Sequence, residues 1–131
     1  MRLLLDTHVF LWAATAPKKM AASAFDAIVH LENEVYVSAV AAWEIAIKHS
    51  LGKLQLPMAP ASWLAGRIRQ LGFSELAVSV EHAVAIGQLP MHHADPFDRL
   101  LIAQAQVEGL TLVTADPQIL RYRVKALDAR A

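Results

Sequence analysis

Four acidic residues, although far apart in the chain, have the types and positions expected of an oxygen-rich metal site: Asp6, Glu44, Asp98 and Asp116. Asp6 directly follows the apolar run 3–5, and Asp116 follows the run 110–114. Both acids therefore come just after a predicted strand, at the end where open α/β sheets place their ligands. The Asp6 carboxylate is expensive to desolvate there without a cation or hydrogen-bond donors. An all-oxygen set suits Mg²⁺ or Mn²⁺.

The other two acids lie in predicted helices. Glu44 lies in the helical run 38–48, which follows the strand signal 35–37, and Asp98 lies in the first turn of a helix that begins near Pro96. Glu44 is roughly 9 Å along its helix, but its side chain leans back toward the helix start. We therefore expect the four carboxylates to converge. Carboxylates brought together without a cation repel one another and raise one another's pKa, which a divalent ion relieves.

Most of these acids also have a purely structural explanation. Asp95 and Asp116 each precede a proline, and Asp at the N-cap followed by Pro is a common helix start. The helix dipole would favour Asp98 in a first turn. Glu44 could pair with Lys48 four residues later, which contributes about 0.3–0.5 kcal/mol. The joint pattern of the four acids is more informative than any one of them.

Length and composition predict one domain, residues 1–131. The chain is 56% hydrophobic, which is ample for a single core. No apolar stretch reaches the ~18 to 20 residues of a membrane span. The apolar start 1–5 is too short for a signal-peptide core, so we expect a cytoplasmic protein. Without cysteine, the chain has neither a disulfide framework nor a thiolate metal site.

Charge gives no general sign of nucleic-acid binding. Twelve Lys and Arg residues balance twelve Asp and Glu residues, so the basic excess of most nucleic-acid binders is missing. A nucleic-acid substrate would need a local basic patch. The candidates, each equally explained as a solvated surface charge, are Lys48, Lys53, Arg67, Arg69, Arg99, Arg121 and Arg123.

The order of elements predicts the fold class. Hydrophobic runs, prolines and glycines indicate strands at 2–5, 35–37, 76–78, 110–113 and 124–127, and helices at 7–13, 18–32, 39–50, 61–71, 80–88 and 96–108, with a short helix after Pro117. Strands that alternate with helices predict an α/β fold. Its central, mainly parallel sheet would be covered by helices on both faces, as a three-layer α/β/α sandwich.

Four segments carry a family resemblance that spans the whole chain. They are LLDTHVFLW at 4–12, SAVAAWEIAIK at 38–48 with LGKL at 51–54, HADPFDRLLIAQA at 93–105, and LTLVTAD at 110–116. Each motif is weak alone, but in this order and spacing they resemble the successive motifs of PIN-domain ribonucleases of the VapC toxin type.

The resemblance implies a set of site residues and a reaction. The family's four acids, which serve as metal ligands and catalytic residues, map to Asp6, Glu44, Asp98 and Asp116. Thr114 matches the family's usual Thr or Ser near the last acid. The implied activity is that of an endoribonuclease that hydrolyses RNA phosphodiester bonds with water activated by Mg²⁺ or Mn²⁺.

Three further residues have two interpretations each. Asp95 either caps its helix or shares the role of the third acid, and we favour Asp98 for that role. Lys48 and Arg99 either contact the scissile phosphate or form salt bridges with Glu44 and Asp95.

The resemblance also implies partners, namely a homodimer and a cognate VapB-like antitoxin whose tail packs across apolar helices. The apolar side chains of 10–12, and of Trp63, Leu64, Ile68 and Leu71, are candidates for such contacts, although core packing explains most of them.

Three alternatives remain open at this point. The segment 92–95, His-His-Ala-Asp, together with 6–8, could form a His/Asp site for a transition metal in a phosphohydrolase. A receiver-like Mg²⁺-binding domain would need paired acids after its first strand, where this chain has only Asp6. A metal-binding domain could also serve mainly as a partner of another protein.

Overall fold

A five-stranded, all-parallel sheet forms the centre of the molecule. In the computed structural model, which describes residues 1–130, the strands are β1 (Arg2–Leu5), β2 (Glu34–Ser38), β3 (Ser74–Leu76), β4 (Thr111–Thr114) and β5 (Ala126–Asp128). Their spatial order is β3-β2-β1-β4-β5. The N-terminal strand therefore occupies the middle, where Leu4 pairs with Tyr36 on one side and with Leu112 on the other. The predicted α/β fold with a parallel sheet is confirmed.

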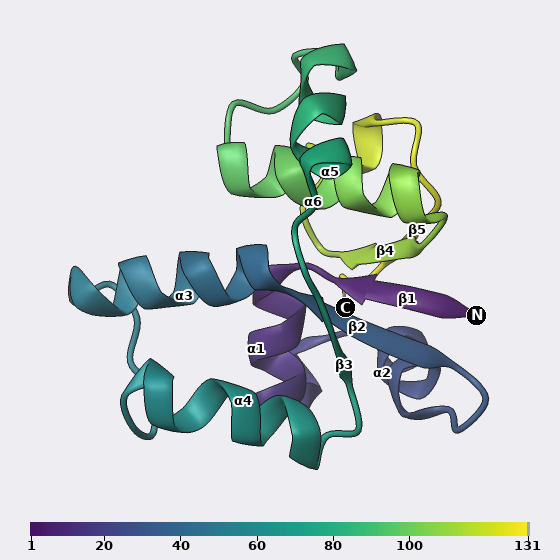
Figure 1. Cartoon of the computed structure of the whole chain (residues 1–131). Helices are drawn as coiled ribbons and strands as arrows, with labels where there is room; N and C mark the ends of the chain where they lie inside the picture. The colour runs from purple at the N-terminus through teal and green to yellow at the C-terminus, as the bar shows by residue number, and fades with distance from the viewer. Residues whose placement is uncertain (131) are drawn as a thin grey trace.

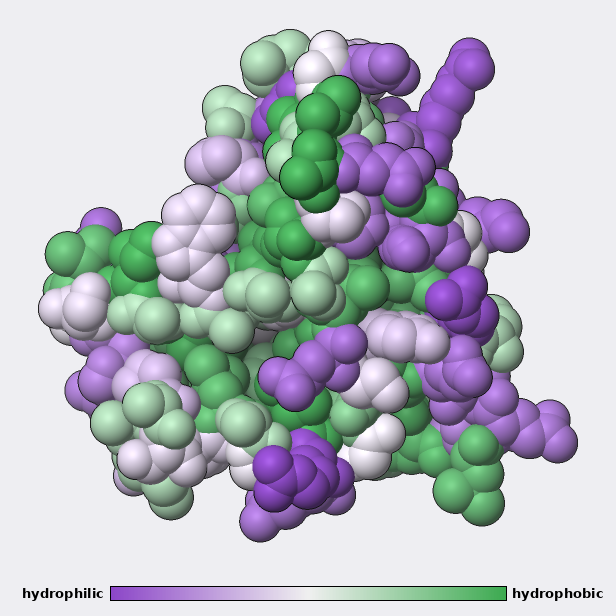
Figure 2. All heavy atoms as spheres, in the orientation of Figure 1, coloured by the Kyte–Doolittle hydropathy of each residue, from purple (hydrophilic) through white to green (hydrophobic). Residues whose placement is uncertain are grey.

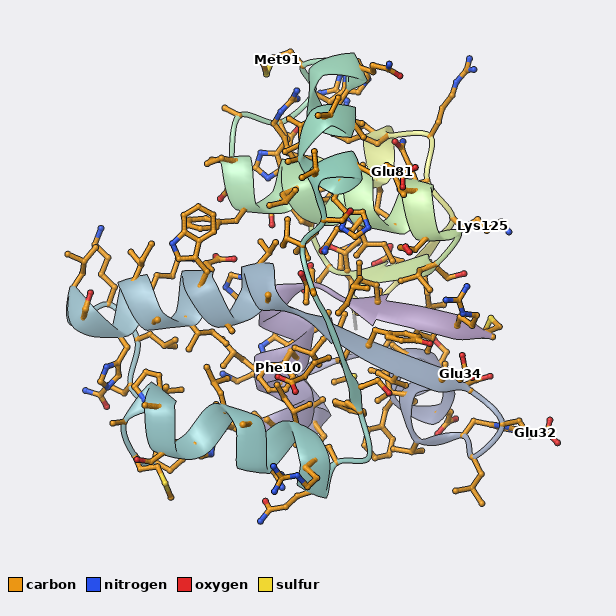
Figure 3. The ribbon with its side chains drawn as sticks, in the orientation of Figure 1. Phe10, Glu32, Glu34, Glu81, Met91 and Lys125 are labelled. Atoms are coloured by element: carbon orange, nitrogen blue, oxygen red, sulfur yellow. The ribbon has the colours of Figure 1, made fainter. Side chains whose placement is uncertain are left out.

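Helices cover both faces of this sheet, because successive residues of a buried strand point to opposite sides. The helices are α1 (Thr7–Thr15), α2 (Ala22–Val29), α3 (Ala39–Ser50), α4 (Pro60–Gln70), α5 (Val80–Ala85) and α6 (Pro96–Glu108). Leu3 and Leu5 pack with α1, α2 and α4 in one core, which includes Phe10, whereas Leu4 packs with α6 in a second core. Figure 1 shows these two layers below and above the sheet, and Figure 3 shows Phe10 inside the lower one.

Two predicted helices are shorter than expected. In place of the single helix expected at 18–32, the structure has a short 3₁₀ turn at Pro17–Lys19 and, after a break, the helix α2. The break arises because Met20 is buried and Ala21 donates its backbone N–H to the carbonyl of Ala129 (3.0 Å). The helix expected at 80–88 becomes 3₁₀ from Ile86 to Gln88.

Two strands lie slightly away from their expected positions. β3 ends at Leu76, not at residue 78, because its partner Ser38 is the last residue of β2 and the cap of α3. β5 runs to Asp128, opposite Thr114, somewhat later than the expected 124–127. The short helix expected after Pro117 is a 3₁₀ turn at Ile119–Arg121.

None of the helices in residues 1–130 is long and apolar enough to cross a membrane.

Candidate metal centre

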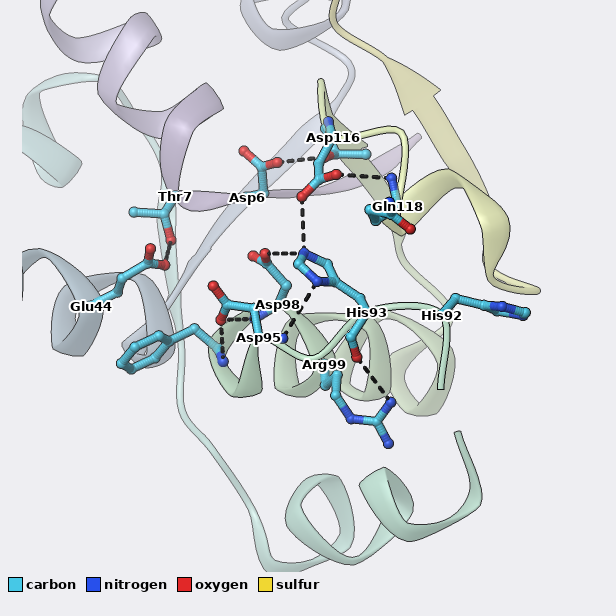
Figure 4. Close-up of polar contacts among 12 residues, drawn as sticks. Asp6, Thr7, Glu44, His92, His93, Asp95, Asp98, Arg99, Asp116 and Gln118 are labelled. Carbon is cyan, nitrogen blue, oxygen red and sulfur yellow. Dashed lines mark hydrogen bonds and ion pairs between the residues drawn. The ribbon is translucent and has the colours of Figure 1, made fainter. Parts of the chain in front are cut away.

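One pocket collects the predicted acids at the carboxyl ends of β1 and β4. It has a volume of about 400 Å³ and is lined by Asp6, Thr7, His8, Trp12, Glu44, Lys48, His93, Asp95, Asp98, Ala115, Asp116 and Pro117. The structure therefore brings all four predicted acids to one place, together with Asp95 and Lys48. Figure 4 shows their carboxylates facing a common space between α1, α3 and the start of α6.

Asp6 is both a helix cap and a pocket residue. Its Oδ1 accepts the backbone N–H of Val9 (2.8 Å), which caps α1, and its Oδ2 accepts the hydroxyl of Thr114. The residue is only 5% exposed. Burial raises the pKa of its carboxyl, and the two hydrogen bonds oppose that shift. Thr114 therefore acts as an orienting donor at the end of β4.

Glu44 is buried on α3 and held by two donors. Its Oε1 accepts the hydroxyl of Thr7 (2.7 Å), and its Oε2 accepts the ammonium of Lys48. This hydrogen bond to Glu44 raises the pKa of Lys48. The pairing expected from the sequence is thus present, and it lies inside the pocket with Lys48 about two-fifths exposed. Lys48 remains within reach of a substrate bound there.

Asp95 and Asp98 have different positions in the first turn of α6. Asp95 is the N-cap, and its Oδ1 accepts the backbone N–H groups of Phe97 (2.8 Å) and Asp98 (3.3 Å). Asp98 makes no cap and directs its carboxylate toward His93. Burial, followed by repulsion from Asp95 and Glu44, raises the pKa of Asp98 to about 7.

His93 joins the acids, which the four-acid pattern did not include. Its Nε2 lies 2.9 Å from Asp98 Oδ2 and 3.0 Å from Asp116 Oδ2. Its Nδ1 accepts the backbone N–H of Asp95 (3.4 Å), an arrangement that places the ring proton on Nε2, between the two carboxylates. The only sequence signal for this role was the His-Ala-Asp segment considered for a transition-metal site.

Asp116 is oriented by backbone contacts. Its N–H donates to the Thr114 hydroxyl (3.0 Å), and its Oδ1 accepts the N–H of Gln118 (2.8 Å), which leaves Oδ2 directed at His93. Like Asp6, Asp116 combines a local turn-forming role with a place in the pocket.

This donor set fits a divalent cation. Ligand atoms of His93, Asp98 and Asp116 lie within 4.8 Å of one another, and Asp6 and Glu44 line the same pocket. Burial is the main cause of the raised pKa of Asp98, and the repulsion from Asp95 and Glu44 that adds to it is what a cation would relieve. Oxygen ligands dominate the set, and the His93 imidazole could join them only by giving up its Nε2 proton.

Arg99 lies elsewhere than expected. It is buried, does not line the pocket, and donates to the carbonyls of Pro90 (3.0 Å) and Ile86 (3.3 Å) and to the hydroxyl of Tyr122 (3.2 Å). Within residues 1–130 the expected salt bridge with Asp95 is not formed, and Arg99 lies outside the acidic pocket where a phosphate contact was expected. Arg99 instead holds the loop that carries His93, as Figure 4 shows.

The histidine pair is divided between two sides of its loop. His92 points away from the acids and packs edge-on against Tyr122 (5.1 Å between ring centroids). The two histidines therefore do not form a joint site. His8 lines the acidic pocket beside Trp12.

The chain matches the PIN domain over residues 3–125. It belongs to the PIN family. This PIN domain is 32% identical to Ribonuclease VapC22 of Mycobacterium tuberculosis (strain ATCC 25618 / H37Rv) over 123 residues, which cover 92% of this chain and 91% of that protein. It is 47% identical to Ribonuclease VapC16 of the same strain over 53 residues, 40% of this chain and 36% of that one. The resemblance inferred from the motifs is confirmed.

Solved structures support the same fold for this PIN domain. VapBC2 from Rickettsia felis, bound to a DNA fragment from its promoter, has a TM-score of 0.73 at 16% identity, over 98% of this chain and 99% of that one. FitAcB from Neisseria gonorrhoeae has a TM-score of 0.62 at 20% identity, over 96% of both chains. The predicted three-layer PIN sandwich is confirmed, and a receiver-like fold is not compatible with it.

Proposed function

We propose that this PIN domain, as a single domain over residues 1–131, is a ribonuclease toxin of the VapC type that hydrolyses RNA phosphodiester bonds. The observation that carries the proposal is the pocket in which Asp6, Glu44, Asp98 and Asp116 converge. The relationship to Ribonuclease VapC22 over nearly the full length of both proteins supports it.

The catalytic residues and metal ligands in this proposal are Asp6, Glu44, Asp98 and Asp116, with Mg²⁺ or Mn²⁺ as the cofactor. The bound cation would supply an activated water and stabilise the charge that develops on the phosphate. Thr7 and Thr114 fix the Glu44 and Asp6 carboxylates in single orientations through their hydroxyls. Such fixed orientation lowers the reorganisation needed at the moment of reaction.

Two basic side chains complete the proposed mechanism. Lys48 shares the pocket with the acids and can donate to a non-bridging oxygen of the scissile phosphate. His93 holds a proton on Nε2 between Asp98 and Asp116, so it can exchange that proton with the reacting groups. No nucleophilic side chain is required.

The test of this function is metal-dependent cleavage of a structured RNA pool. The wild-type chain should cleave with Mg²⁺ or Mn²⁺ and stop with EDTA, whereas Asp6→Asn should be inactive with its fold intact by circular dichroism. Cleavage that survives both EDTA and Asp6→Asn would exclude the mechanism. If Zn²⁺ but not Mg²⁺ supports activity, the His/Asp phosphohydrolase alternative gains, because His93 already lies among the acids.

The proposal includes partners: RNA as substrate, a VapB-like antitoxin, and a second copy of the chain, all in the cytoplasm. Several large apolar residues are exposed on α3 and around α5, including Trp43 (54%), Val80 (81%), Val84 (68%) and Met91 (75%). Figure 2 shows hydrophobic side chains gathered on this face. Exposed apolar surface of this kind is typical of protein interfaces. Several related folds come from toxin–antitoxin complexes.

A further inference from the structure

A second pocket lies on the opposite side of the loop that carries His93. Its volume is about 550 Å³, and it is lined by Ala85, Gln88, Leu89, Pro90, His92, Gln106, Val107, Arg121 and Arg123. His92 lines this pocket, while its neighbour His93 lines the acidic one. On the other side, the acidic pocket includes Pro117, four residues before Arg121. Adjacent residues of one loop therefore line the two pockets.

Three cations border this second pocket and its continuation. Arg121, Arg123 and Lys125 are exposed, while Tyr122 between the arginines is buried and Val124 is half-buried. A smaller hollow of about 270 Å³ shares Gln106 and Arg123 with the second pocket and extends to Lys125. Figure 3 shows Lys125 directed into solvent. We call Arg121, Arg123 and Lys125 the basic stripe.

The backbone beneath the basic stripe is anchored. The carbonyl of Arg123 accepts from the Gln106 side chain (3.0 Å), and the carbonyl of Lys125 accepts the N–H of Leu112 in β4 (2.8 Å). The Tyr122 hydroxyl accepts the N–H groups of the loop residues His92 and His93 (3.1 and 2.9 Å). The three cations are therefore presented from a fixed support.

In the part of the chain that the structure describes, the basic stripe makes no ion pair. Within residues 1–130, no carboxylate lies within ion-pair distance of Arg121, Arg123 or Lys125, and the one side-chain partner of Arg121 is the neutral Gln118 (3.3 Å). Arg67, by contrast, is bound to the carbonyl of Ala14. In a chain with zero net charge, two arginines at the second pocket and a lysine at the adjoining hollow, none of them in an ion pair, make a local site for anions.

We propose that this second pocket and the basic stripe form a subsite for single-stranded RNA next to the scissile phosphate. Arg121 and Arg123 bind backbone phosphates, and one unstacked base enters the pocket. Guanidinium groups suit phosphates, and the side-chain amides of Gln88 and Gln106 can donate to and accept from a base edge. Single-stranded RNA is recognised by such splayed bases, and the imidazole of His92 offers a surface for stacking. This inference rests on the proposed function in its choice of RNA as the ligand and in placing the scissile phosphate at the acidic pocket.

The test measures RNA binding in the uncleaving Asp6→Asn background, by fluorescence anisotropy with a labelled, unstructured RNA dodecamer, at salt concentrations from about 50 to 200 mM. The double variant Arg121→Ala with Arg123→Ala should bind RNA more weakly. The steepness of the plot of log association constant against log salt concentration should fall by about 1.4, which is about 0.7 for each of the two lost phosphate contacts. Lys18→Ala with Lys19→Ala is the matched control, because it removes the same charge from exposed residues of the turn at Pro17–Lys19 and should leave the slope unchanged.

A neutral variant tests the base pocket separately. Gln88→Leu should lower the affinity about threefold to tenfold without changing the salt slope, since it removes a hydrogen bond and no charge. Melting temperatures of the variants should match that of the parent, because the substituted side chains are exposed.

Equal affinity and equal salt slope for the arginine double variant and its parent would overturn the subsite. The subsite would also be overturned if the double variant bound the antitoxin more weakly but bound RNA as tightly as its parent. These results are independent of the cleavage assay. If the wild-type chain cleaves RNA but the arginine substitutions do not change RNA binding, only the subsite is refuted. If the chain binds RNA through the basic stripe but does not cleave it, only the ribonuclease function is refuted.

Discussion

Two carboxylates of this pocket each combine a local structural contact with a contact inside the pocket. Asp6 caps α1 with one oxygen and accepts from Thr114 with the other, and Asp116 fixes the turn at Gln118 while it faces His93. For Asp116, where the sequence left a choice between a structural role and a ligand role, the turn contact therefore leaves Oδ2 free to face the pocket. In α6, by contrast, Asp95 is the cap, and the neighbouring Asp98 carboxylate makes no cap.

Separate substitutions should distinguish the two acids of α6. Asp98→Asn should abolish RNA cleavage without lowering the stability, because Asp98 caps nothing. Asp95→Ala should cost about 0.5–2 kcal/mol of unfolding free energy and retain much of the activity, because it removes a cap that accepts two backbone N–H groups. Urea unfolding and a cleavage assay on the same preparations measure both quantities. The reverse pattern would reassign the third acid to Asp95.

The metal-free protein should lose stability as the pH rises. The pKa of Asp98 is raised from 3.8 to about 7 in the folded state, so the folded protein holds a proton that the unfolded chain releases between these values. This contribution is fully present below the unfolded pKa and is lost as the pH rises through about 7. In EDTA, the unfolding free energy should therefore fall between about pH 5 and pH 7.5. Asp98→Asn should flatten that part of the profile, and an unchanged profile would contradict the assignment.

At the scale of elements, the ends of β1, β2 and β4 decide where the site forms. Apolar strands and proline-marked helix starts were readable in the sequence, so the sheet and the positions of the four acids could be predicted. The break before α2 could not be predicted from the sequence, because it depends on a hydrogen bond from Ala21 to the distant Ala129. The role of Arg99 was also hidden, since nothing local shows that its partners are carbonyls of the preceding loop.

The contacts of Arg99 predict that its substitution lowers both the stability of the protein and the rate of cleavage. Arg99→Lys should cost about 1.5–3 kcal/mol, because an ammonium cannot reproduce the fork that binds Ile86, Pro90 and Tyr122 together. The loop that carries His93 should loosen, so cleavage should slow even where the protein remains folded. Denaturant unfolding and kcat measure the two effects. Arg69→Lys, at an exposed position of α4, is the control and should be near neutral.

At the scale of the whole molecule, the balanced net charge conceals an uneven distribution. Acids gather at one pocket and the basic stripe at the next. Overall composition argued against a nucleic-acid substrate, whereas the placement of a few charges favours one. Exposed apolar residues on α3 and around α5 add a surface suited to protein partners.

Growth arrest caused by this chain should be relieved by a small partner protein. An acidic pocket accepts a basic side chain from an inserted peptide as readily as a cation, and the exposed apolar residues can provide affinity. Co-expression with the neighbouring open reading frame should restore growth, yield a complex on purification and lower nuclease activity. Overexpression of Asp6→Asn should be harmless without the partner. If the wild-type chain is equally harmless, the toxin assignment is wrong.

The central place of β1 has a consequence for the timing of activity during synthesis. β1 is translated before β4, with which it pairs, and the Asp6 carboxylate takes its hydroxyl donor from Thr114. A chain still being translated has Asp6 and Glu44 but not the far side of the pocket, and pairing across so long a separation is slow. The acidic pocket is therefore complete only after the segment that carries Asp98, Thr114 and Asp116 has been translated.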